Sequence, residues 1–177
     1  MTQATGPVSP VEPLESRHPI DPRDLRNALG CFGTGVAVIT ARAGEGRRAG
    51  LTVNSFASVS LDPPLVLWSL VAHSPSLSVF QEASHFTVNV LARSQQHLAL
   101  HFARPSDDKF AAVGWTEGRG GAPVLDHVVA HFQCRNANRY YGGDHVIFLG
   151  AVESYNYTGE EALHFSRGKF GRFTPHE

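Results

Sequence analysis

Residues 50–67 read GLTVNSFASVSLDPPLVL, and the side chains in the first part of this segment alternate in character. The odd-numbered positions from 51 to 59 carry small or apolar residues, apart from one serine. The even-numbered positions carry hydroxyl and amide groups around one phenyl ring: Thr52, Asn54, Phe56, Ser58 and Ser60. Because successive side chains of a strand point to opposite faces, this alternation predicts a strand with one polar face.

The polar face of this strand needs hydrogen-bond partners, because polar groups without partners are costly to bury. Water can supply them if the strand lies at the edge of a sheet. Alternatively, the row of short hydroxyl and amide groups suits an aromatic ligand that is rich in heteroatoms and ends in a phosphate. The periodicity favours neither alternative, so both stay open at this point.

The bulk composition is that of one globular domain. The chain has 177 residues, of which 42% are hydrophobic and 18% charged, and this excludes a disordered or collagen-like protein. A net charge of −1 provides no basic field for nucleic acid. Apolar runs are too short to span a bilayer, so we expect no membrane association. Four prolines interrupt the first twenty residues, so we expect a flexible arm over 1–20 and a single domain over 21–177.

Several kinds of site lack the residues that they require. Cys31 and Cys134 share no close spacing, which predicts reduced thiols in a cytoplasmic protein. The N-terminus lacks a charged region followed by an apolar stretch, so we expect no secretion signal. His97 and His101 lie four apart without a further ligand, so we predict a solvated helix face and no metal site. No Gly-x-Gly-x-x-Gly, phosphate loop or Gly-x-Ser-x-Gly motif is present, which argues against a Rossmann nucleotide site and a hydrolase.

The remaining patterns predict many strands and few helices. Asp21 followed by Pro22 is typical of a helix start, and Leu25 and Leu29 then share one helical face with Phe32. A second helix is expected to start with Ser74 and Pro75, and a third to cover residues 95–102. We expect further strands over 36–40, 65–70, 85–91, 127–135, 145–155 and 163–166, and an irregular segment over 103–124. Because strands and helices do not alternate regularly, this order favours an antiparallel barrel over a doubly wound sheet.

Residues 140–145, YYGGDH, contain two glycines before a histidine that opens the next predicted strand. The glycines allow a tight turn, and functional side chains are often placed at such loop rims. His145 could therefore donate to a ligand carbonyl or phosphate. It could equally be an exposed imidazole on a hairpin turn.

Taken in order, several segments resemble the short-chain flavin reductase family: residues 29–40 (LGCFGTGVAVIT), 50–67, 86–91 (FTVNVL), 143–145 (GDH) and 167–171 (RGKFG). Together they cover roughly residues 22–173. The resemblance implies a mainly β fold with short helices, namely a Greek-key, antiparallel split β-barrel of the FMN-binding type. It also implies the reductase component of a two-component flavin-dependent monooxygenase.

The resemblance further implies the residues of the site. His145 would lie near the nicotinamide as the catalytic residue. The residues that would bind the flavin are Thr34, Gly35, Val36, Thr52, Val53, Asn54, Ser55, Ala57, Ser58, Val59, Ser60, Asn89, Val90, Leu91, Gln95, Phe102, Gly168 and Phe170. The chain departs from the family pattern at Phe170, where tyrosine is common, and at Cys31, which we interpret as a packing residue.

By this resemblance, the protein would use NADH or NADPH to reduce non-covalently bound FMN or FAD and supply reduced flavin to a partner monooxygenase. Since a flavin provides the redox chemistry, no nucleophile or acid–base pair is required of the protein. A homodimer is also implied. The alternatives are a flavoprotein that retains its flavin and reduces another acceptor, and a non-catalytic flavin- or haem-binding protein. Arg104, Lys109 and Arg139 are candidates for distinguishing NADH from NADPH.

Overall fold

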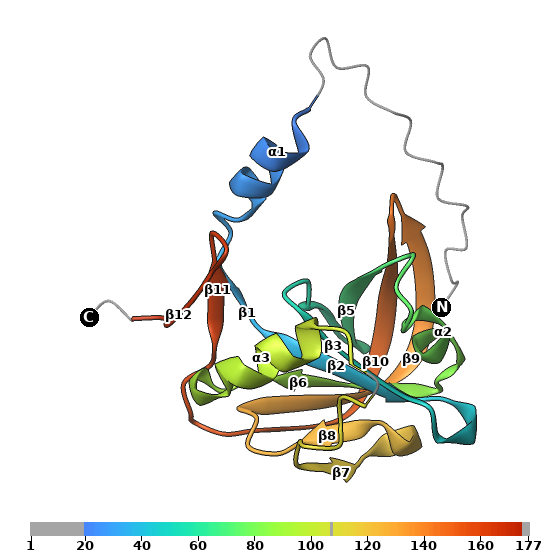
Figure 1. Cartoon of the computed structure of the whole chain (residues 1–177). Helices are drawn as coiled ribbons and strands as arrows, with labels where there is room; N and C mark the ends of the chain where they lie inside the picture. Colours follow the sequence, from blue (N-terminus) through green and yellow to red (C-terminus); the bar gives the residue numbers. More distant parts are fainter. Residues whose placement is uncertain (1–19, 107, 175–177) are drawn as a thin grey trace.

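A seven-stranded antiparallel sheet forms the body of the protein in a computed structural model that describes residues 20–106 and 108–174 (Figure 1). Its strand order is β3-β2-β6-β9-β10-β5-β4. The strands, in chain order, are β2 (Ala37–Arg42), β3 (Arg48–Val53), β4 (Ala57–Leu61), β5 (Pro64–Val71), β6 (His85–Val90), β9 (Ala130–Gly142) and β10 (His145–Tyr157). The prediction of a mainly β split barrel is therefore confirmed.

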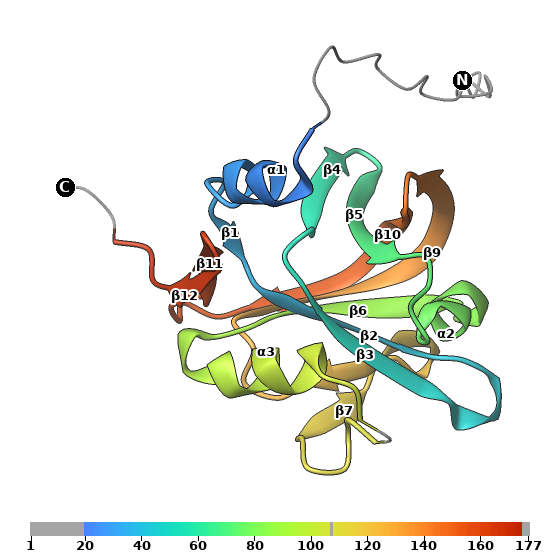
Figure 2. The ribbon, with the colours of Figure 1, turned by 45° about the horizontal axis from the view of Figure 1, so that its top comes forward.

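Two small sheets and three helices complete the fold (Figure 2). One small sheet has the order β1-β11-β12 and the other pairs β7 with β8. Their strands are β1 (Thr34–Gly35), β7 (Trp115–Glu117), β8 (Pro123–Leu125), β11 (His164–Ser166) and β12 (Lys169–Gly171). The helices are α1 (Pro22–Leu29), α2 (Leu77–Glu82) and α3 (Gln96–Ala103), with short 3-10 turns at Gly44–Gly46, Arg93–Gln95 and Arg119–Gly121.

The prediction of one continuous strand over residues 51–60 is wrong. The segment is interrupted at residues 54–56, and its two halves, β3 and β4, lie at opposite edges of the large sheet. The side chain of Ser55 explains the interruption, because its Oγ accepts a hydrogen bond from the backbone N–H of Ser69 at 3.0 Å. The Ser55 side chain therefore holds residues 54–56, which connect β3 to β4, against β5.

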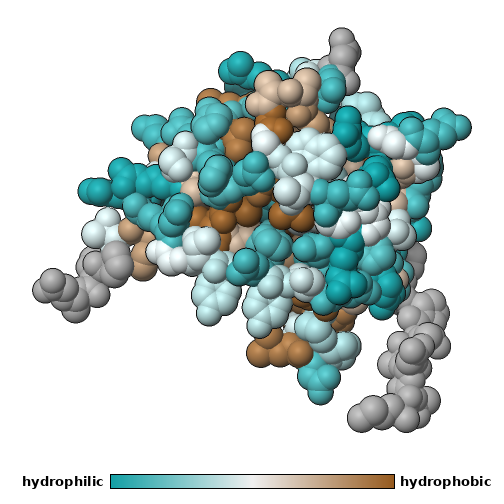
Figure 3. Space-filling view, turned by 90° about the horizontal axis from the view of Figure 1, so that it is seen from below, coloured by the Kyte–Doolittle hydropathy of each residue, from teal (hydrophilic) through white to brown (hydrophobic). Residues whose placement is uncertain are grey.

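The core has two parts, which hold the strands rigidly in place. Trp68 stacks on Phe148 in the first part, with ring centroids 4.5 Å apart, and both side chains are fully buried. The second part surrounds Phe102 of α3 and includes Phe110, whose ring centroid lies 5.4 Å from that of Phe102. The β7–β8 hairpin covers this second part, and the view from below shows apolar atoms between mostly polar side chains (Figure 3).

Helix α1 begins as predicted but buries nothing. The Asp21 carboxylate accepts a hydrogen bond from the backbone N–H of Arg23 at 2.7 Å, which caps the helix. None of its residues is buried; Leu29 is 66% exposed, and Phe32 just beyond it is 80% exposed. Figure 1 shows α1 projecting away from the barrel. Its apolar face therefore has no partner within the described chain.

Three further expectations need correction. Helix α2 begins at Leu77 and not directly after Ser74, whose hydroxyl instead accepts from the backbone N–H of Ser76. The segment 103–124 contains β7 and runs into β8, so it is not wholly irregular. Strand β9 continues to Gly142, where polar residues on both faces hide the alternation typical of a strand. The predicted arm over residues 1–20 lies outside the described residues, apart from Ile20.

Candidate functional site

The residues predicted to bind a flavin gather mainly around two grooves. The first, which we call the α3 groove, has a volume of about 240 Å³ and lies between the end of β3, helix α3 and the β11–β12 hairpin. It is lined by Val36, Thr52, Val53, Asn54, Ala99, Leu100, Ala103, Phe165 and Phe170. Five of these were predicted from the sequence: Val36, Thr52, Val53, Asn54 and Phe170. The sequence analysis missed Phe165, although it lies beside Phe170 across the hairpin.

The second groove, which we call the β4 groove, has a volume of about 590 Å³ and lies outside β4 and β5. It is lined by Phe56, Ala57, Ser58, Ser60, Leu61, Pro64, Leu65, Val66, Phe132, Val152 and Tyr155. The predicted residues Ala57, Ser58 and Ser60 therefore belong to this groove and not to the α3 groove. Val59 lies on the same strand with 48% of its surface exposed.

Some polar groups near these grooves are already paired within the protein. The Thr52 hydroxyl donates to the carbonyl of Ala99 at 2.7 Å, so it joins β3 to α3. In contrast, the Asn54 amide makes no hydrogen bond among the described residues, and the hydroxyl of Thr34 is buried without a partner. A buried polar atom without a partner is uncommon and costly, and Trp68 Nε1 and Thr87 Oγ1 in the core are two further examples among the described residues. Apolar walls beside such groups fit a flat ring system that carries heteroatoms.

Two predicted binding residues instead hold the scaffold together. Asn89 is fully buried: its Nδ2 donates to the carbonyl of Val38 at 3.0 Å, and its Oδ1 accepts from the N–H of Leu125 at 2.9 Å. Gln95 accepts from the N–H of Ala92 at 2.9 Å and donates to the carbonyl of Asp126 at 2.8 Å. The side-chain amide of Asn89 is therefore paired within the protein. Both amides fix the elements on which the α3 groove is built.

The other predicted residues are a mixture of buried and exposed positions. Leu91 and Phe102 are fully buried in the second core, below the α3 groove. Val90 is half-buried at the end of β6. Gly35 and Gly168 are exposed, on β1 and in the turn between β11 and β12 respectively.

His145 lies at the tip of the β9–β10 hairpin and is exposed. Its Nδ1 is 2.7 Å from a carboxylate oxygen of Asp144. The hydrogen bond and the charge of His145 lower the pKa of Asp144. His145 pairs with Val71 on β5, while the next residue but one, Ile147, pairs with Ser69.

The strand register places His145 near one end of the predicted site. Because Ser55 is bonded to Ser69, His145 lies only two residues, about 7 Å along the strand, from the level of the crossing between β3 and β4. The β4 groove is farther away, since Leu65 pairs with Ala151, six residues or about 20 Å along β10. The histidine is therefore closer to Asn54 than to the hydroxyl groups of β4.

Two of the three cations considered for nicotinamide selectivity are tied to carbonyl groups. The ammonium of Lys109 donates to the carbonyls of Gly50 at 3.0 Å and of Phe102 at 2.7 Å, and burial lowers the pKa of this lysine. Arg139 donates to the carbonyl of Gln81, beside a separate polar hollow between α2 and β9. Arg104 is exposed directly after α3.

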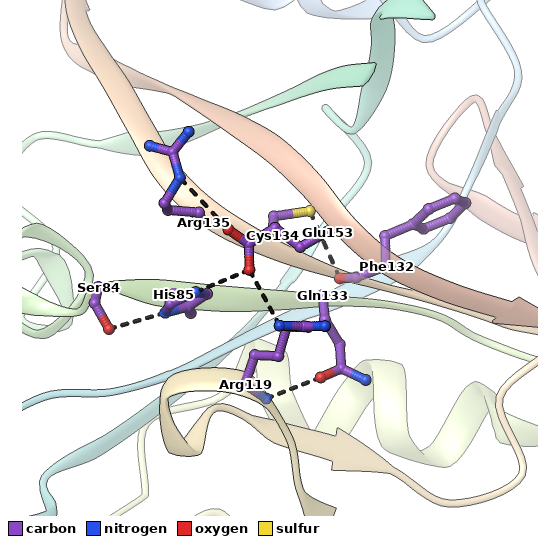
Figure 4. Close-up of polar contacts among 8 residues, drawn as sticks. All are labelled: Ser84, His85, Arg119, Phe132, Gln133, Cys134, Arg135 and Glu153. Atoms are coloured by element: carbon purple, nitrogen blue, oxygen red, sulfur yellow. Dashed lines mark hydrogen bonds and ion pairs between the residues drawn. The ribbon is translucent and has the colours of Figure 1, made fainter. Parts of the chain in front are cut away.

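A cluster of charged residues surrounds Glu153, which is the extra residue of a bulge in β10 (Figure 4). Its carboxylate lies 3.3 Å from Nε2 of His85 and 3.5 Å from guanidinium nitrogens of both Arg119 and Arg135. Burial, together with the charge of Glu153, raises the pKa of the neighbouring Cys134 to about 12. These groups satisfy one another and the thiol stays protonated, so the cluster is a structural clamp and not a second active site.

Two other kinds of feature are absent from residues 20–106 and 108–174. No group of three or more His, Cys, Asp or Glu side chains in these ranges could hold a metal ion. No helix in the described part of the chain has the length and apolar character needed to cross a membrane.

Comparison with known proteins identifies a matching family and similar relatives. Residues 29–174 match the model of the flavin reductase like domain. An FMN reductase (NADH) from Agrobacterium fabrum is 46% identical over 152 residues, which are 86% of this chain and 86% of that protein. The reductase component of a flavin-dependent trigonelline monooxygenase from Acinetobacter baylyi is 44% identical over 86% of this chain. The chain spans only 49% of the length of that relative and 49% of a flavin reductase from Rhizobium meliloti.

Solved structures show the same arrangement. An NADH:FAD oxidoreductase from Streptomyces globisporus, in complex with NAD and FAD fragments, has a TM-score of 0.82 at 41% identity, and the match covers 89% of this chain and 98% of that one. The flavin reductase of a styrene monooxygenase from Pseudomonas putida S12 has a TM-score of 0.78 at 30% identity, covering 86% of this chain and 98% of that one.

Proposed function

The chain belongs to the flavin reductase like domain family, and on that premise we propose that it uses NADH or NADPH to reduce non-covalently bound FMN or FAD. The observation that carries the proposal is the α3 groove, in which apolar walls stand beside the amide of Asn54, which makes no hydrogen bond among the described residues. A bound flavin would accept a hydride from the nicotinamide and carry the two electrons onward.

The side chains around the groove would bind and orient rather than react. Val36 and Phe170 provide apolar walls, and the exposed Asn54 provides hydrogen-bond groups at the rim. Thr52 keeps β3 against α3, so the groove holds its shape when no ligand is bound. Holding two reactants in contact and in the correct orientation accounts for a large part of the rate acceleration in such a reaction.

His145 is proposed to orient the nicotinamide. The Asp144 carboxylate accepts a hydrogen bond from only one ring nitrogen, Nδ1, so Nε2 remains available to a ligand. The imidazole would therefore hydrogen-bond to the nicotinamide and would not remove a proton. This role agrees with the position of His145 near the crossing between β3 and β4.

We further propose that reduced flavin passes to a partner monooxygenase. The relatives from Acinetobacter baylyi and Rhodococcus jostii are named as reductase components of flavin-dependent monooxygenases. In this chain, the α3 groove opens at the surface, where Asn54 is exposed, so a bound flavin could leave without unfolding of the barrel. The reduced cysteines expected from the sequence favour a cytoplasmic protein.

A homodimer is the proposed assembly. The apolar face of α1, formed by Leu25, Leu29 and Phe32, is exposed and has no partner among residues 20–106 and 108–174, and the β4 groove is also lined mostly by apolar side chains. A helix of eight residues is marginal in water unless its apolar face is packed. A second copy of the chain would cover both surfaces in a symmetric manner.

A steady-state assay with two flavins against two nicotinamide nucleotides tests the function. We expect loss of nicotinamide absorbance that depends on added flavin in at least one of the four combinations. No turnover in any combination would overturn the proposal. Desalting after incubation with the flavin then separates the two enzyme alternatives, since a releasing enzyme loses its colour and a retaining enzyme keeps it.

A further inference from the structure

A hollow of about 420 Å³ lies beside the proposed flavin site, and apart from Gly168 none of its lining residues has a part in the function described so far. It is lined by Arg26, Asn27, Gly30, Cys31, Arg167 and Gly168. Two segments far apart in the sequence form it: the end of α1 with the loop that follows, and the turn between β11 and β12. Two arginines thus face one hollow from opposite ends of the chain.

Hydrogen bonds fix these two segments against each other. The backbone N–H of Arg167 donates to the carbonyl of Gly30 at 2.8 Å, and the Ser166 hydroxyl donates to the same carbonyl at 3.3 Å. A Cβ added to Gly30 would lie 3.5 Å from the Cα of Arg167, so the two backbones approach closely. Arg167 and Gly168 have φ angles of +49° and +75°, as the two central residues of a tight hairpin turn require. The position of Arg167 over the hollow is therefore set by the backbone.

The charges at this hollow are not balanced. Arg42 and Arg93 each pair with a glutamate, but neither Arg26 nor Arg167 forms an ion pair within residues 20–106 and 108–174. The positions three and four residues from Arg26, which face it on the helix, carry no acid. Residues 162–174 contain two arginines and one lysine but no acid, in a protein whose net charge is −1. Two guanidinium groups that line one hollow without an acidic partner suit an anion such as a phosphate group.

The hairpin that carries Arg167 also borders the α3 groove. Phe165 on β11 and Phe170 on β12 line that groove, and Arg167 follows Phe165 by two residues, about 7 Å along the strand. A ligand with its ring in the α3 groove can therefore extend along this hairpin towards the two arginines. We propose that Arg26 and Arg167 form a binding site for a phosphate group of the nucleotide that the protein uses. This inference rests on the proposed function.

Binding measurements on three flavins test the inference without reference to turnover. Riboflavin, FMN and FAD share the ring system, but only FMN and FAD carry phosphate. We expect R26Q and R167Q each to weaken FMN or FAD binding by about tenfold in titration calorimetry, with riboflavin affinity unchanged, because each removes a charged hydrogen-bond donor. R23Q, which removes a charge from the same helix outside the hollow, is the matched control and should change nothing.

Titrations with NADH and NADPH identify the source of the phosphate. Selective loss of NADPH affinity with all flavins unaffected would support the phosphate site and assign it to the nicotinamide nucleotide. Loss of riboflavin affinity equal to that of FMN would overturn the inference, since it indicates general distortion. Unchanged affinity for every nucleotide would also overturn it, and a lowered Tm in that case would show that the arginines serve only the end of α1.

The wild-type protein distinguishes failure of this inference from failure of the proposed function. If the wild type oxidises NADH or NADPH with a flavin but the variants bind all nucleotides normally, only the phosphate site is wrong. If the wild type neither turns over nor binds any of these nucleotides, both proposals fall.

Discussion

At the scale of single residues, the contact between Asp144 and His145 orients an imidazole that is otherwise exposed. The carboxylate oxygen lies 2.7 Å from Nδ1, and its pKa is lowered by this contact, so it stays charged throughout the neutral range. A charged partner on Nδ1 fixes the ring and directs Nε2 away from Asp144. This arrangement supplies a hydrogen-bond donor or acceptor for a ligand without a buried charge.

We expect His145→Ala to lower kcat/KM for the nicotinamide nucleotide by about tenfold, the value of one oriented hydrogen bond. Flavin affinity should change little, because His145 is proposed to contact the nicotinamide. Steady-state kinetics and flavin titration measure the two quantities separately. Tyr141→Phe is the control: Tyr141 lies in the same hairpin as His145, and its hydroxyl accepts a hydrogen bond from Gln81 of α2. This substitution should leave both quantities unchanged. Equal loss of both quantities, or of neither, would contradict the role of His145.

Cys134 makes the folded protein sensitive to alkaline pH. Its pKa is raised to about 12 from the ordinary 9.0, mainly by burial and also by the charge of Glu153. As the pH rises above 9.0, the thiol loses its proton in the unfolded chain before it does so in the folded protein. The free energy of unfolding therefore keeps the full contribution of this thiol below pH 9.0 and decreases between pH 9.0 and about 12. The expected loss approaches about 1.4 kcal/mol per pH unit.

Denaturant unfolding at several pH values between 8 and 11 tests this dependence. Cys134→Ala should unfold more easily at every pH, because it leaves a cavity, but its stability should fall less steeply than that of the wild type as the pH rises. Cys31→Ala is the control, since that thiol is exposed. Identical slopes in all three proteins would contradict the assignment to Cys134.

At the scale of elements, the bulge in β10 determines what Glu153 contacts. An extra residue between Val152 and Ser154 turns the carboxylate towards His85 of β6, Arg135 of β9 and Arg119 of the turn before β8. Bulges commonly redirect a side chain in this way. One carboxylate therefore joins the large sheet to the β7–β8 hairpin that covers the second core.

We expect Glu153→Gln to destabilise the protein by about 1–2 kcal/mol, since it leaves several cations around a neutral amide. Glu161→Gln removes a carboxylate that pairs only with Arg93 at an exposed position, so its expected cost is below about 1 kcal/mol. Urea unfolding measures both changes, and high salt should reduce the difference between the two variants. A larger cost for Glu161→Gln would contradict the clamp.

Most individual elements could be predicted from local patterns, but the interruption between β3 and β4 could not. The alternation over residues 51–60 is continuous, and nothing within those residues shows that Ser55 bonds to Ser69. The same limit applies to Asn89, whose partner Leu125 lies 36 residues away. Hydrogen bonds between segments distant in the chain are chosen by the tertiary fold.

At the scale of the whole molecule, the exposed face of α1 determines the expected assembly. Leu29→Lys places a charge in the centre of that face, and we expect it to weaken dimerisation by at least about tenfold, as the loss of one buried leucine implies. Sedimentation velocity at several protein concentrations measures the change. Asn27→Lys adds the same charge to the opposite face of the helix and should leave the dimer intact.

Two results would contradict this assembly. A wild-type protein that sediments as a monomer at micromolar concentration would exclude the homodimer. If Leu29→Lys and Asn27→Lys weakened the dimer equally, the added charge on α1 would explain the loss of dimerisation, and the apolar face would have no specific role in it.

The segments of the chain, taken in order, resemble the family that the comparison shows. Caps, alternation and turn residues predicted the mainly β fold, because they act over only a few positions. The position of His145 in a tight turn could also be found in this way. Local patterns do not contain the partner of each polar group, and these partners decide which residues can bind a ligand. Folding paired the amides of Asn89 and Gln95 with backbone groups and left the Thr34 hydroxyl without a partner among the residues that the structure describes, since only the packed chain brings distant donors and acceptors together.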